Sequence, residues 1–325
     1  MGGAGELKYK VMDAHTHVGC WEKEGIEERV GMKECWTKWE RQMGLSALRK
    51  DLVAELGPAA SDPAKVPDFT LEHTIKVMNR DGVEKIVLIP MNNSTIPPST
   101  FRWFSPNDHV KRAVDRYPDR FIGLMAVDPL RGTEGCIREM DRCAKLGLVG
   151  VKLYPPSGYA INDHELTYPI YRKASELGLI VYIHTGATVL YGCRFAHKGR
   201  ELSNAIQISE VAQDLPDLKI VMCHFNGSWG FDTGYGVMLV SPNVYGEFDM
   251  KIWTARCKWP IRGKLYEEQM AAAMDAFPDR CLIGSDYPMV YPFSLWIRKI
   301  EDLDIMSDTE KKKLLETNAR SLFKA

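Results

Sequence analysis

Short apolar segments alternate with amphipathic ones along the chain, and this alternation constrains the fold more than any other feature. Eight segments rich in Val, Ile and Leu have the pattern of buried parallel strands: 9–15, 85–91, 121–128, 149–155, 179–186, 219–226, 243–250 and 281–288. Six segments between them have the periodicity of helices: 71–82, 107–118, 133–147, 165–178, 204–217 and 264–279. A last one, 307–323, closes the chain, and Ser307 and Glu310 have the spacing of a capping box.

Eight β units with helices between them predict an α/β fold, a (β/α)8 TIM-like barrel, within one domain spanning residues 1–325. A doubly wound open sheet is the alternative, but no G-x-G-x-x-G follows a predicted strand. The barrel is expected to be distorted by an insertion, 19–70, after its first strand. Because this insertion contains Trp21, Trp36 and Trp39, we expect a lid or a dimer contact rather than a disordered loop.

Charge and hydropathy exclude several classes of partner. The 42 Lys and Arg residues nearly balance the 43 Asp and Glu residues, so nothing favours nucleic acid. No apolar run is long enough to cross a membrane, and the first residues lack the layout of a secretory signal. We therefore expect a cytoplasmic protein that acts on a small molecule, as a homodimer or higher homo-oligomer.

The ends of the predicted strands carry the residues that could do chemistry. Catalytic groups of a barrel gather at the carboxyl ends of its strands. The residues there are imidazoles, one amine and one carboxylate: His15, His17, Lys152, His184, His224 and Asp286. Each alone has an ordinary explanation, such as a hydrogen-bonded histidine or a helix cap. Together, imidazoles and a carboxylate are the mixture that Zn²⁺, Fe²⁺ and Mn²⁺ accept, so the set favours a metal site. The other histidines are interpreted as surface residues: His73, His109, His164 and His197.

The ordered motifs DAHTH, GVKLYPP, YIHTG, CHFNG, LIGSDYP and TNARSLF resemble the amidohydrolase superfamily. They are most similar to the branch that includes aminocarboxymuconate semialdehyde decarboxylase and γ-resorcylate decarboxylase. The resemblance implies a divalent metal ion held by four residues: His15, His17, His184 and Asp286. In binuclear members a carboxylated lysine, here Lys152, bridges two ions, and His184 and His224 bind the second. One ion is favoured over two, and zinc over iron or manganese.

The resemblance also implies a reaction. We expect a hydrolase that cleaves a small-molecule amide, lactone or related bond through a metal-activated water, with Asp286 and His224 as catalytic residues. The alternative is a non-oxidative decarboxylase of an aromatic or dienoic acid, in which His or Asp protonates the carbon that loses CO₂. Less favoured are a binuclear iron or manganese redox enzyme and a non-catalytic barrel that binds partners through its Trp-containing insertion.

Substrate-binding residues are harder to assign from the sequence. Tyr154, on the same side of its strand as Lys152, is either a contact for the substrate or an aromatic plug in the barrel. Arg194 is a candidate anchor for a carboxylate. Glu247 and Asp249 stand where related proteins show hydroxyl groups. They are expected to bind metal, to hold a cationic part of the substrate, or to pair with a base such as Lys251.

Overall fold

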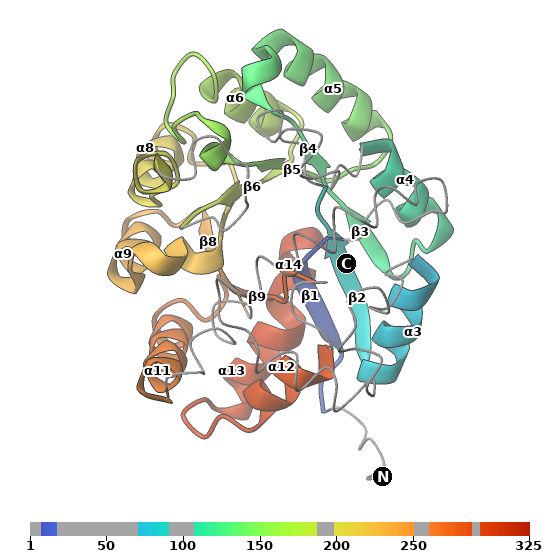
Figure 1. Ribbon diagram of the computed structural model, residues 1–325, viewed down its shortest axis with the longest axis vertical. Helices are drawn as coiled ribbons and strands as arrows, with labels where there is room; N and C mark the ends of the chain where they lie inside the picture. The colour runs from blue at the N-terminus through green and yellow to red at the C-terminus, as the bar shows by residue number, and fades with distance from the viewer. Residues whose placement is uncertain (1–7, 18–70, 91–106, 187–197, 250–259, 288–292) are drawn as a thin grey trace.

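A computed structural model describes residues 8–17, 71–90, 107–186, 198–249, 260–287 and 293–325. Within these ranges the strands form a ring, most helices lie outside it, and α14 lies across its middle in the view of Figure 1. The strands are β1 Val11–Thr16, β2 Val83–Leu88, β3 Phe121–Gly123, β4 Met125–Ala126, β5 Gly150–Leu153, β6 Ile180–His184, β7 Ile220–Cys223, β8 Val244–Asp249 and β9 Cys281–Gly284. Every pairing between them is parallel, in two runs, β1-β2-β3 and β4 to β9 in order.

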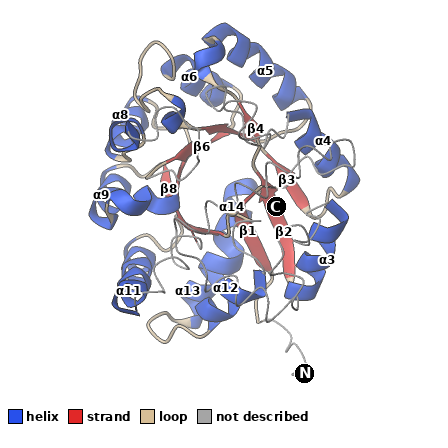
Figure 2. Cartoon of the chain, viewed as in Figure 1, coloured by secondary structure: helices blue, strands red, loops and turns tan. Residues whose placement is uncertain are grey.

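The two runs close into one barrel of eight strand positions. β3 and β4 are one strand interrupted at Leu124, whose N–H still donates to the carbonyl of Leu88 at 2.9 Å. At the other junction, Thr16 of β1 bridges Tyr287 after β9. The amide of His17 donates there to the carbonyl of Tyr287 at 2.6 Å. The barrel predicted from the sequence is therefore confirmed, and the insertion at 19–70 lies outside the described residues (Figure 2).

The helices follow the predicted order with three additions, of which the short α7 is one. They are α3 Leu71–Asp81, α4 Asn107–Arg116, α5 Thr133–Lys145, α6 Tyr168–Glu176, α7 Gly199–Leu202, α8 Ile206–Asp214, α9 Phe231–Val240, α11 Pro260–Ala276, α12 Phe293–Glu301, α13 Asp308–Lys312 and α14 Asn318–Phe323. α9 and α12 were not predicted. The capping box at Ser307 and Glu310 is present at the start of α13. No helix in the described part of the chain is both long and apolar enough to span a membrane.

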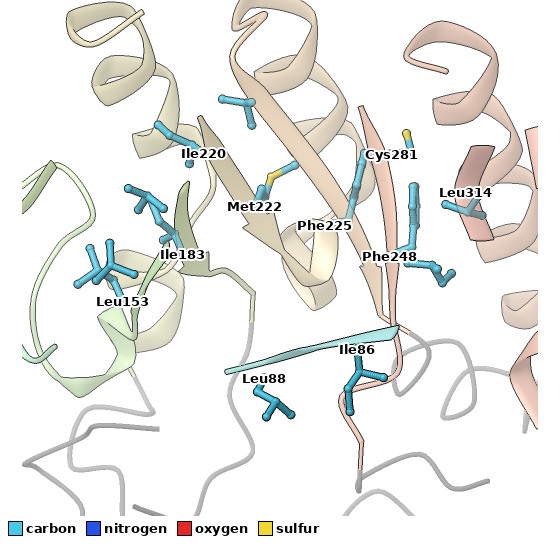
Figure 3. Packing of buried hydrophobic residues seen from close by; sticks show 14 of the residues in the cluster. Ile86, Leu88, Leu153, Ile183, Ile220, Met222, Phe225, Phe248, Cys281 and Leu314 are labelled. Carbon is cyan, nitrogen blue, oxygen red and sulfur yellow. The ribbon is translucent and has the colours of Figure 1, made fainter. Parts of the chain in front are cut away.

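Two apolar layers hold the barrel. The outer layer fills the space between strands and helices, and Figure 3 shows part of it, including Ile183, Met222 and Phe248. The inner layer contains alternate strand residues such as Met12 and Tyr182, together with residues of α14. Because α14 packs on the inner residues near the amino ends of the strands, polar side chains gather at the carboxyl ends.

Candidate metal centre

A β-bulge in β1 turns the side chains of His15 and His17 into the barrel. Met12 and Ala14 pack inside, so strict alternation would turn His15 and His17 outward. The pairing with β2 prevents this. Asp13 pairs with Ile86 and Thr16 with Leu88, so between these two pairs β1 contains one residue more than β2. An extra residue of this kind re-aims the side chains that follow it.

Three ligand atoms converge where β1 and β9 end. The Nε2 atoms of His15 and His17 lie 3.2 Å apart. Oδ1 of Asp286 lies 3.0 Å from Nε2 of His17 and 3.7 Å from Nε2 of His15. All three side chains are almost completely buried, and one ligand atom from each lies within 4.8 Å of the others.

The tautomers of the two rings give this cluster atoms that could hold a cation. Nδ1 of His17 lies 2.7 Å from the carbonyl of Ile89, which can only accept, so Nδ1 carries the proton. Burial and the nearby Lys152 ammonium hold the pKa of His15 well below its usual value, and its Nδ1 donates to Glu247 at 2.6 Å. Each Nε2 therefore turns a lone pair toward the other and toward the carboxylate. A divalent ion fits this set of donors.

His184 and His224 form a second pair beside the first. Nε2 of His224 lies 3.0 Å from Nδ1 of His184, and one of these nitrogens donates to the other. The ring centroid of His224 is 5.0 Å from that of His15, so the two pairs share one site. Tyr154 is buried with its ring 4.5 Å from that of His184. Of the four ligands implied by the resemblance, three form the triad and His184 belongs to this second pair.

The turn after β7 is left-handed at three residues in a row. The φ angles of His224, Phe225 and Asn226 are 65°, 45° and 57°. Non-glycine residues rarely adopt this conformation. Here the side-chain oxygen of Asn226 accepts a hydrogen bond from the backbone N–H of Ala205 at 2.9 Å. The backbone N–H of Asn226 donates to the hydroxyl of Thr185 at 2.9 Å. These bonds hold His224 toward the barrel axis, a role for Asn226 that the sequence did not reveal.

Both carboxylates of β8 contact imidazole rings. Glu247 accepts from His15, and Oδ2 of Asp249 lies 2.7 Å from Nδ1 of His224. Both carboxylates are fully buried. Burial raises the pKa of Glu247 to about 7. Lys251, the base suggested as their partner, lies outside the described residues, so that pairing stays a prediction.

Asp13 joins the two strands that carry the triad. Its Oδ1 accepts the amides of His15 and Ser285, each at 3.0 Å. Burial raises its pKa to about 7. Asp13 belongs to the DAHTH motif but received no role from the sequence, because no sequence pattern shows which backbone amides its carboxyl group would accept.

Two predicted residues remain, Lys152 and Arg194. Lys152 is buried, and its Nζ donates to the Cys223 thiol at 2.9 Å. Burial raises the pKa of that thiol to about 12, so it remains protonated. Arg194 lies outside the described residues.

Comparison with known families and proteins agrees with this geometry. A family model described as Amidohydrolase matches residues 100–325. A curated relative, 2-amino-3-carboxymuconate-6-semialdehyde decarboxylase of Dictyostelium discoideum, is 28% identical over an alignment 280 residues long, and the match covers 75% of this chain and 74% of the relative.

Solved structures share the fold. A TIM-barrel protein of Bordetella bronchiseptica, described as uncharacterized, has a TM-score of 0.70 and 22% identity, over 97% of this chain and 99% of that one. The 5-carboxyvanillate decarboxylase of Novosphingobium aromaticivorans, with bound manganese and 3-methoxy-4-hydroxy-5-nitrobenzoic acid, has a TM-score of 0.60 and 21% identity, over 100% of this chain and 99% of that one. At this identity the likeness concerns the barrel alone.

Proposed function

This chain belongs to the amidohydrolase family, and we propose that it is a metal-dependent decarboxylase of a small aromatic or dienoic acid. The choice of reaction rests on one observation. The curated relative that aligns with three quarters of this chain is a decarboxylase of a carboxymuconate semialdehyde. The sequence had ranked hydrolysis first. The family itself uses a divalent metal ion, and the converging triad supplies ligands for one.

We assign one ion to four residues: His15, His17, His184 and Asp286. When bound, the ion would orient the oxygens of the substrate and stabilise negative charge on them. Zinc and manganese both suit imidazole and carboxylate ligands, and the carboxyvanillate decarboxylase binds manganese. Because the amine of Lys152 contacts Cys223, we propose that it remains unmodified and that no second ion is bridged.

His224 is the residue best placed to deliver a proton. Its ring lies between His15 and His184, and Asp249 stands beside its Nδ1. When the carboxyl group of the substrate leaves as CO₂, its bonding electrons remain on the carbon. A proton from His224 then binds to that electron pair, so that the substrate carboxylate and one proton become CO₂ and a product with a new C–H bond.

Hydrolysis is the second candidate, because the matching family model is described as Amidohydrolase. In that reaction His224 would take a proton from the attacking water and Asp286 would help to hold that water. The same side chains serve both reactions. In decarboxylation a carbon receives the proton, whereas in hydrolysis a leaving oxygen or nitrogen receives it.

A paired assay separates the two reactions. Purified full-length protein, depleted of metal and reloaded with Zn²⁺ or Mn²⁺, would be incubated with a dienoic acid, 2-amino-3-carboxymuconate 6-semialdehyde, and an aromatic acid, 5-carboxyvanillate. Metal-dependent CO₂ release, lost in His17→Ala, supports the proposal. Release of acid from amides or lactones without CO₂ contradicts it and favours hydrolysis.

The number of ions and of subunits needs separate measurements. Near one equivalent of metal per chain, unchanged in Lys152→Met, is expected from the contact between Lys152 and Cys223. Two equivalents that fall to one in this variant would contradict the single-ion assignment. We also propose a homodimer, which light scattering of the full chain would test, and a cytoplasmic location remains a prediction.

A further inference from the structure

We propose that the two carboxylates of β8 are positioning residues with separate tasks. Glu247 fixes a metal-binding imidazole, and Asp249 acts on the imidazole that handles the proton. The division of labour rests on the proposed function, because it assumes that His15 binds the ion and His224 moves the proton. The task of Glu247 concerns metal binding and can be measured without a substrate.

The alternation of β8 places both carboxylates inside the barrel. Glu247 and Asp249 are two residues apart and therefore project from the same face of the strand. Both side chains are fully buried. The strand is held in place from both sides, since Gly246 pairs with Met222 of β7 and with Cys281 of β9. One strand therefore presents two carboxyl groups to the same site, two residues apart.

Glu247 reaches His15 through a short hydrogen bond. Its Oε2 accepts from Nδ1 at 2.6 Å, which fixes the tautomer that leaves the Nε2 lone pair for the ion. Gly284 of β9 makes room for this contact, because a Cβ there would lie 2.5 Å from Oε1 of Glu247. The carboxylate therefore has one position, and it sets the orientation of the ring.

Asp249 positions the ring of His224. Its Oδ2 lies 2.7 Å from Nδ1 of that ring. The backbone of Asp249 is anchored on both sides by the Tyr266 hydroxyl, at 3.2 Å from its N and from its O. A carboxylate anchored in this way limits the positions that the His224 ring can take.

The chain offers matched variants for each task. Glu247→Leu removes the acceptor, whereas Glu247→Gln keeps an oxygen that can accept from Nδ1. Asp249→Asn removes the charge with little change in shape, and Asp249→Glu restores it. All are compared with wild-type full-length protein, with circular dichroism and thermal unfolding used to select folded variants.

The first experiment titrates Zn²⁺ or Mn²⁺ into metal-depleted protein by calorimetry. Glu247→Leu should raise the metal Kd about 10- to 100-fold, the usual loss when the partner of a metal-binding histidine is removed, and Glu247→Gln should raise it less. Asp249→Asn should leave both Kd and stoichiometry unchanged. An unchanged Kd in folded Glu247→Leu overturns the role of Glu247, and a lost equivalent of metal in Asp249→Asn shows that Asp249 is itself a ligand.

The second experiment observes His224 directly. In protein labelled with ¹⁵N-histidine, the ring signals of His224 are those absent from His224→Asn. Asp249→Asn should shift them while the signals of His17 stay, and Asp249→Glu should restore them. Unmoved signals overturn the role of Asp249 whether or not CO₂ is released. In the metal-loaded enzyme, kcat should fall about tenfold or more at unchanged KM. Failure of wild-type turnover would refute only the proposed function.

Discussion

His224 and Asp286 both have left-handed backbones, with φ angles of 65° and 57°. Such a conformation costs on the order of 1–3 kcal/mol for a residue with a side chain, and it persists only where the surroundings impose it. At His224 the surroundings are the Asn226 and Thr185 hydrogen bonds. At Asp286 they are the bonds between β1 and β9, since its amide donates to the carbonyl of His15 at 2.9 Å. The strain therefore aims two reactive groups at one point.

Replacing His224 separates chemistry from strain. Asn tolerates a left-handed backbone, so His224→Asn should unfold within about 1 kcal/mol of wild type while turnover falls about 100-fold or more. His224→Val should lose the same activity and also be destabilised, because a β-branched residue is disfavoured at this φ. Urea unfolding and steady-state rates measure both. Equal stability of the two variants would contradict the assignment of strain.

Gly284 is required for its lack of a side chain. A Cβ there would lie 2.5 Å from Oε1 of Glu247 and 2.5 Å from Cβ of His15. Because both groups are fixed, Gly284→Ala should cost about 1–3 kcal/mol and weaken metal binding. Gly236 of α9 has nothing within 4 Å of such an atom, so Gly236→Ala should instead stabilise the helix by about 0.5–1 kcal/mol. Unfolding midpoints and metal titrations compare the two, and equal effects would exclude the packing argument.

At the scale of elements, the eight strands were predictable because buried parallel strands are nearly continuous apolar runs. The sequence did not indicate the bulge in β1 or the break at Leu124, because both follow from pairing with β2. α9 was missed since its apolar residues run together instead of recurring at helical spacing. The surface position predicted for His109 is wrong: it is 6% exposed, on the inner side of α4.

The candidate site was predictable in part, for a related reason. Strand ends supplied His15, His17 and Asp286, because the barrel brings its carboxyl ends together. Their partners could not be found, since Asp249 meets His224 only through the packing of two strands. The position of a carboxylate in the sequence does not indicate which imidazole it contacts in the folded barrel.

Two carboxylates join α4 and α5: Asp108, which Arg142 contacts at 2.7 Å, and Glu139. Glu139 accepts two bonds from Arg142 and one from Asn107, whose Oδ1 also accepts the Ala126 amide at the end of β4. The hydrogen bonds from Arg142 lower the pKa of Glu139 to about 2. Because Glu139 is partly exposed, we expect Glu139→Gln to cost only about 1 kcal/mol at pH 7.

The sign of the pH dependence follows from that lowered pKa. The unfolded chain binds a proton at Glu139 near its usual pKa of 4.5, whereas the folded protein binds it only near 2. The stabilisation is therefore complete above about pH 4.5 and is lost as the pH falls toward 2. Urea midpoints at pH 6 and pH 3.5 should show the gap between wild type and Glu139→Gln narrowing at the lower pH. A constant or widening gap would contradict the role of Glu139.

At the scale of the whole molecule, the proposed ion joins the beginning and the end of the barrel. His15 belongs to β1, His17 directly follows it, and Asp286 lies two residues after β9, so the triad lies at the seam where the ring closes. Asp13 holds the same seam through two amides. A ligand bound there connects segments about 270 residues apart in sequence, and it opposes opening of the barrel at its first and last strands.

Metal should therefore stabilise the entire fold. An ion that binds only the folded chain adds about 2.7 kcal/mol at 100 times its Kd, which corresponds to an increase in Tm of about 5 °C for a domain of this size. A chelator should remove this increase, and His17→Ala should abolish it while leaving the Tm of the metal-free protein near that of wild type. His164 is exposed and pairs with Glu210, so His164→Ala should keep the full response. Calorimetric scans with and without Zn²⁺ measure each case, and a metal response that survives in His17→Ala would place the ion elsewhere.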